Sequence, residues 1–161
     1  MTLIGIPIIF IMISIFEMSR GMWIYDTVAH ASREGIRFAI VHGYNCVNTP
    51  PVTNDCAKTI ADVAAVIKST GVGLELNTTT IRFTAPSPGG AVVTCTLAAV
   101  GGCSGITTIW PPVGNNTVGT IVQIDVTTQF RSALSMFWPG AGKVDFSTVN
   151  LGATSVDAVQ F

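Results

Sequence analysis

The chain has 161 residues and a formal net charge of −1, from 8 lysines and arginines against 9 acidic residues. Electrostatic binding of nucleic acid needs a basic surface, so this charge balance argues against that function. Charged residues make up 11% of the chain and hydrophobic residues 48%, and the mean hydropathy is +0.56. This composition excludes disorder and indicates that part of the chain lies in lipid or against other protein.

The first 16 residues carry no charge, and 12 of them are hydrophobic. A bilayer-spanning helix needs roughly 20 apolar residues, so this is a short span, which Trp23 and Tyr25 could extend to a membrane interface. Three interpretations compete: a cleaved signal peptide, a single-span anchor, and a pilin-type helix that later packs against copies of itself. A signal peptide needs a basic start, and no Lys or Arg precedes Arg20.

Only the pilin-type interpretation explains why a helical pattern continues far beyond the apolar residues. Positions on one predicted helical face recur at steps of three and four residues, namely Met22, Tyr25, Ala29, Ser32, Ile36 and Ile40. Gly43 is a natural end for the helix. The pattern therefore predicts a rod over residues 7–42, which Pro7 begins or kinks because proline lacks an N–H.

Charged residues along this rod are spaced for pairing on one helix. Glu17/Arg20 and Glu34/Arg37 are i,i+3 pairs, and His30 stands four residues from both Asp26 and Glu34. Residues 26–37 are interpreted as a solvated face. Glu17 borders the apolar run, where a carboxylate is costly unless it is paired. It either pairs with its own Arg20 at the membrane boundary or sets register by pairing with a cation of a neighbouring subunit.

The same segment carries a family pattern. The chain reads EMSR from Glu17, WIYDTV from Trp23 and ASREGIRFA from Ala31, after an apolar run with one proline. In these residues it resembles the TadE-like family of the tight-adherence pilus system, whose pattern is E-F-G-R, W-x-Y-N-x-V and A-A-R-E-G-A-R-Y-A-V. The resemblance covers about 40 residues. With Pro7 aligned, Met1 falls near the Glu that follows the leader in such pilins, so the leader either lies outside this chain or is processed differently.

The resemblance implies a pilin-like subunit that is inserted in the cytoplasmic membrane and then assembled into an extracellular filament. Its expected partners are copies of itself and the inner-membrane pilus assembly machinery. The residues expected to serve assembly and helix packing are Pro7, Ile11, Glu17, Arg20, Trp23, Tyr25, Arg33 and Glu34.

The remaining residues, 44–161, predict a β-rich head that follows the helical residues 1–43. Residues 57–70 have a short amphipathic helix pattern. Strands are predicted at 79–85, 91–97 and 119–130 by period-two alternation, with a PSPGG turn at 86–90, and at 144–150 and 154–161. No alternation of helices with strands appears, so the sheet should be antiparallel. The expected fold is α+β, and the head is expected to fold without the rod.

Four cysteines occur, and three pairings are possible. Their spacings favour two local disulfides, Cys46–Cys56 and Cys95–Cys103, because the intervening stretches read as loops. Disulfides imply an oxidising compartment outside the cytoplasm. Free thiols and a metal site are the alternatives, and His42 lies four residues before Cys46, although the C-x₂₋₄-C spacing of metal sites is absent.

Nothing in the sequence favours catalysis, a cofactor or a metal. No nucleophile, zinc-protease or phosphate-loop motif is present. The leading hypothesis is a structural, non-enzymatic subunit that polymerises through its N-terminal helix into a pilus, with adhesion as the expected role. The alternatives are a minor pseudopilin that primes or tips a Tad pilus, and a membrane-anchored β domain that binds a surface.

Overall fold

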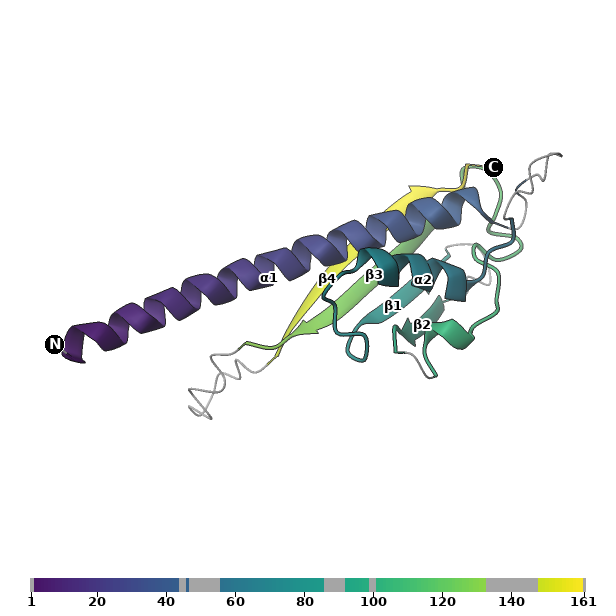
Figure 1. Ribbon diagram of the computed structural model, residues 1–161. Coiled ribbons are helices and arrows are strands. Elements are labelled where there is room, and N and C mark those ends of the chain that lie inside the picture. Colours follow the sequence, from purple (N-terminus) through teal and green to yellow (C-terminus); the bar gives the residue numbers. More distant parts are fainter. Residues whose placement is uncertain are drawn as a thin grey trace.

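The computed structural model describes residues 2–43, 46, 56–85, 92–98, 101–132 and 148–160 (Figure 1). The chain forms an α+β fold in which a long N-terminal helix is followed by an antiparallel sheet, as predicted. The elements are α1 (Thr2–Val41), α2 (Ile60–Thr70), β1 (Thr80–Thr84), β2 (Val92–Thr96), the short 3₁₀ helix η1 (Cys103–Gly105), β3 (Ile121–Phe130) and β4 (Val149–Ala158).

Helix α1 is one uninterrupted element of 40 residues. It begins five residues before Pro7, which therefore lies inside the helix instead of beginning it. Near a helix N-terminus the missing N–H of a proline removes only one backbone bond, to the carbonyl of residue 3. At about 1.5 Å per residue the rod is roughly 60 Å long. Its N-terminal half projects beyond the rest of the described chain (Figure 1).

The C-terminal half of α1 is part of the core. Six of its apolar residues are buried with the sheet and α2: Ile24, Val28, Ala31, Ile36, Ala39 and Ile40. The predicted face was partly wrong, because Met22 and Tyr25 are exposed while Ser32, Ile36 and Ile40 are buried. The long helix therefore ends near the expected boundary at residue 43, but residues on both sides of this boundary belong to one hydrophobic core.

Helix α2 begins at Ile60, three residues later than predicted. Thr59 forms a capping box with Asp62, in which each side chain bonds the other residue's backbone N–H. Ala57, the predicted first residue, has a φ of 58°, which is incompatible with a right-handed helix. Gly35 lets α1 approach α2 closely, because a Cβ there would lie 2.5 Å from Ile67 Cγ1.

The four-stranded sheet has the order β2-β1-β3-β4, and every neighbouring pair is antiparallel. Strand β3 is buried at every second residue from Val122 to Phe130, as its alternation predicts. Both helices lie on one side of the sheet (Figure 1). On that side Phe83 of β1 packs edge-to-face against the buried Trp110, with ring centroids 5.4 Å apart.

Strand β4 corrects the prediction of two C-terminal strands. Residues 149–158 form one strand that pairs with β3 along its whole length, through Gly152 and Ala153 where a break was expected. Gly152 faces Thr127 across the pair, and backbone pairing with β3 holds this glycine in the strand. The predicted PSPGG turn at 86–90 and the residues 144–147 lie outside the described chain.

Candidate assembly surface

The first half of α1 presents an apolar surface with no partner in the described chain. Its large hydrophobic side chains from Ile4 to Phe16 are mostly exposed, among them Ile11. The helix is long and apolar enough to cross a membrane by length and composition, and only 6% of its most apolar 18-residue window is buried. Exposing this much apolar surface to water is unfavourable in free energy. The exposed Pro7 lies within this surface.

Glu17 ends the apolar run, but it lies on the side of α1 that the head covers. Its side chain is only 7% exposed, and the Oε2 atom is buried without a hydrogen-bond partner. The interpretation of Glu17 as a solvated boundary residue paired with Arg20 is therefore wrong. A pairing of Glu17 with a neighbouring subunit remains a prediction.

Arg20 points to the end of strand β3 instead of to Glu17. Its guanidinium lies over the Phe130 ring, 5.3 Å from the centroid, and donates a 3.5 Å hydrogen bond to the carbonyl of Arg131. A cation over an aromatic face is attracted to the ring quadrupole. Phe130 also lies 3.9 Å from the position of a Cβ on Gly21. The tip of β3 therefore lies on this side of the rod, in contact with Arg20.

The two aromatic residues expected at an interface have different surroundings. The Trp23 ring lies against Gly73, where an added Cβ would come 2.6 Å from it, and half of its surface stays exposed. Tyr25 is exposed on the free side of the rod. Trp23 thus contributes to the head, whereas Tyr25 remains available to a partner.

Of the four predicted charge pairs on α1, one forms. Glu34 and Arg37 make an ion pair of 3.4 Å, exposed to solvent, which contributes little stability. Among these described residues, His30 makes no ion pair with Asp26 or Glu34. Arg33 is exposed. The interpretation of these residues as a solvated face is consistent with their exposure.

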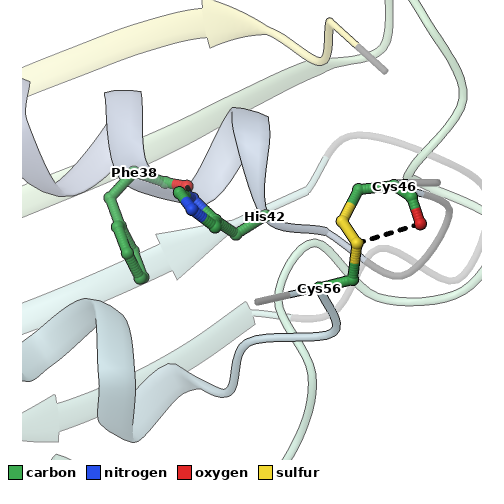
Figure 2. Close-up of a disulfide and its surroundings, with 4 residues drawn as sticks. All are labelled: Phe38, His42, Cys46 and Cys56. Atoms are coloured by element: carbon green, nitrogen blue, oxygen red, sulfur yellow. Dashed lines mark hydrogen bonds between the residues drawn. A yellow bond between two sulfur atoms is a disulfide. The ribbon is translucent and has the colours of Figure 1, made fainter. Parts of the chain in front are cut away.

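Both local disulfides that the spacing predicted are present, Cys46–Cys56 and Cys95–Cys103. Figure 2 shows the first of these beside His42. The His42 ring stacks on Phe38 with centroids 4.3 Å apart, and its Nδ1 lies 2.8 Å from the Phe38 carbonyl oxygen. A disulfide sulfur is not a thiolate ligand, so His42 and Cys46 do not form the beginning of a metal site.

Two buried hydroxyl pairs that join distant elements have no signal in the sequence. Ser32 Oγ of α1 lies 2.9 Å from Ser155 Oγ of β4. Thr79 Oγ1, just before β1, lies 2.9 Å from Thr128 Oγ1 of β3. Serine and threonine on helices and strands are usually solvated, and only the fold brings these partners together. The capping box at Thr59 and Asp62 did have a signal, an acidic residue three positions after a threonine.

The sheet face away from the helices is polar and slightly hollowed, with a volume of about 400 Å³ lined by Arg82, Asp125, Thr127 and Thr154 among others. Asp125 accepts hydrogen bonds from Gln123 Nε2 at 2.8 Å and from Thr154 Oγ1 at 2.7 Å. Arg82 is opposite Asp125 in the strand register. This face offers hydrogen-bonding groups to a polar partner.

Within the described residues, no three His, Cys, Asp or Glu side chains cluster as a metal site would require. Comparison with family models, curated proteins and solved structures finds no match for this chain.

Proposed function

We propose that this chain is a structural pilin-like subunit that polymerises through α1 into an extracellular filament. Before assembly the apolar half of α1 lies in the cytoplasmic membrane, and the inner-membrane pilus machinery transfers it to the filament. The resemblance to the TadE-like family over residues 15–43 motivates the proposal.

The observation that supports the proposal most is the division of α1 into two halves. The C-terminal half is covered by the chain's own sheet and second helix, while the N-terminal half projects as a bare apolar rod (Figure 1). A subunit of this shape leaves the membrane at low cost only if its rod enters an equally dry environment. A bundle of identical rods provides that environment, and a head-to-tail contact that does not close builds a fibre.

The head has the properties expected of a filament wall. Both helices lie on one side of the sheet, so when α1 points to the filament axis the polar face with Arg82 and Asp125 points outward. The two disulfides close loops of the head and suit an oxidising environment. Adhesion would then depend on this outward face.

The decisive experiment replaces Ile11, which is exposed in the middle of the bare rod, with aspartate. A buried, unpaired carboxylate costs several kcal/mol, so Ile11→Asp should abolish fibres in sheared surface material seen by negative-stain microscopy. Val118→Asp is the matched control, because Val118 is an exposed apolar residue of the head. It should leave the fibres intact. Normal fibres from Ile11→Asp would contradict the proposal.

Two alternatives are separated by related experiments. A minor pseudopilin that primes or tips a Tad pilus would place antibody label only at fibre ends, whereas a major subunit is labelled along the whole length. A membrane-anchored surface-binding domain is favoured by the polar hollow around Arg82. It would form no fibres, and Arg82→Ala would abolish its binding to surface polysaccharide.

A further inference from the structure

The exposed side of α1 carries a seam of apolar residues that alternate steps of four and three residues. The seam consists of Ile4, Ile8, Ile11, Ile15, Met18, Met22 and Tyr25, all exposed. This is the 3.5-residue repeat by which two helices pack along a left-handed supercoil. From Ile4 to Tyr25 the seam is roughly 32 Å long at about 1.5 Å per residue.

The seam continues after the uniformly apolar run has ended. This continuation distinguishes packing against another helix from contact with lipid. Up to Phe16 most of the circumference of α1 is apolar, as lipid alone would require. From residue 17 on, Ser19, Arg20 and Asp26 are exposed polar residues, yet Met18, Met22 and Tyr25 keep the repeat. A bilayer contacts the whole circumference and imposes no period, whereas a second helix meets α1 along one line.

The positions that flank the seam suit close approach of another helix. Three of the five flanking positions up to residue 19 are small: Gly5, Ser14 and Ser19. The Ser14 hydroxyl donates to the Phe10 carbonyl at 2.8 Å, and the Ser19 hydroxyl donates to the Ile15 carbonyl at 2.9 Å. Both hydroxyls are therefore satisfied within α1, and burying them against a neighbour leaves no donor unpaired.

The same repeat already packs inside this chain further along the helix. Counting on from Ala29 in steps of three and four residues reaches Ser32, Ile36 and Ala39, which are all buried. Ser32 contacts β4 through Ser155. The seam is thus one stripe whose last part is covered by the chain's own head and whose first part is open.

We propose that the open part of this stripe, from Ile4 to Tyr25, is the line along which α1 packs against α1 of a second copy of this chain. The inference rests on the proposed polymerisation and adds the contact residues. An identical helix carries the matching repeat, so a parallel pair can be in register or shifted by whole heptads, each a shift of about 10 Å at 1.5 Å per residue.

The test uses cysteine substitutions on and off the seam. Ile11→Cys, Met18→Cys and Tyr25→Cys place thiols on the seam one heptad apart, and no free cysteine occurs in the described chain to compete. Ile9→Cys, Phe16→Cys and Trp23→Cys are matched controls on the other side of α1. The seam residues are 59%, 69% and 49% exposed, and the controls are 58%, 70% and 53% exposed.

Each set is expressed as full-length chains, singly and in pairs, and oxidised in membrane vesicles and in sheared fibres. Because a disulfide needs Cβ atoms about 4 Å apart, we expect one combination of the seam set to give roughly tenfold more crosslinked dimer than any control. Single variants test a shift of zero, and pairs test shifts of seven and fourteen residues. The thermal unfolding of each head should match the wild type, except in Trp23→Cys, which loses the contact of the Trp23 ring with Gly73.

Equal crosslinking of the two sets, stronger crosslinking of the controls, or none in either set would overturn the seam as the contact line. Fibres without seam crosslinks would therefore refute the seam and leave the filament function standing. Seam crosslinks in vesicles from a chain that never forms fibres would support the seam and refute the filament function.

Discussion

The hydrogen bond between Ser32 and Ser155 tests whether α1 belongs to the core of the head. Ser32 Oγ donates to the Ala29 carbonyl at 3.1 Å, so the single hydroxyl hydrogen of Ser32 is used within the helix. Ser155 must then donate to Ser32 Oγ across the 2.9 Å contact. Both residues are buried, and the two single substitutions therefore have unequal effects.

Ser32→Ala leaves the Ser155 hydroxyl buried without its acceptor, at a cost of about 2 kcal/mol in the free energy of unfolding. Ser155→Ala leaves Ser32 still bonded to Ala29 and should cost about 1 kcal/mol. The double variant should recover about 1 kcal/mol relative to the sum of the single effects. For a chain of this size, the loss from Ser32→Ala corresponds to a decrease of roughly 4–8 °C in Tm.

The assay is urea unfolding of the full chain in mild detergent, followed by near-ultraviolet circular dichroism of the buried Trp110. Ser69→Ala is the control for helix propensity, because Ser69 is an exposed helical serine whose only hydrogen-bond partner among the described residues is the Val66 carbonyl of its own helix. Equal losses from Ser32→Ala and Ser155→Ala, or strictly additive losses in the double variant, would refute the reasoning.

The fragment 44–161 should not fold, because it lacks the six buried residues of α1, whereas the fragment 17–161 should fold. Cooperative thermal unfolding of 44–161 would contradict this prediction and show that the sheet has a sufficient core of its own. Hydrogen bonds from the backbone and side chain of Thr59 lower the pKa of Asp62 from 3.8, so the stability they contribute is present above pH 3.8 and is lost as the pH falls through the lower folded-state pKa. Thr59→Ala should therefore cost about 1 kcal/mol at pH 7 and less in acid, as urea unfolding at each pH would show. Glu17→Gln removes a buried carboxylate that has an unpartnered oxygen, so this substitution should raise the Tm of the subunit. If a cation of a neighbouring subunit reaches Glu17 in the filament, the same substitution should also lower the fibre yield. An unchanged fibre yield would exclude that pairing.

The local features of this chain could be predicted because each depends on residues close together in the sequence. The long helix follows from an uninterrupted three- and four-residue repeat, and strand β3 follows from period-two alternation. The partners in the disulfides Cys46–Cys56 and Cys95–Cys103 are separated by ten and eight positions, so they are also near in sequence. The two strands predicted at the C-terminus were wrong because Gly152 and Ala153 have weak strand preference, which the full-length pairing with β3 overrides.

Only the tertiary structure decided which face of α1 is buried and what its polar residues contact. An amphipathic pattern shows that a helix has a packing face, but α1 has two, and the sheet covers the one that contains Ile24 and Val28 while Met22 and Tyr25 stay exposed. Glu17 and Arg20 are spaced to pair, yet the Arg20 guanidinium lies over the Phe130 ring and Glu17 keeps a buried oxygen without a partner. Periodicity is a property of one segment, whereas the choice of partner depends on which distant segments the fold brings against it.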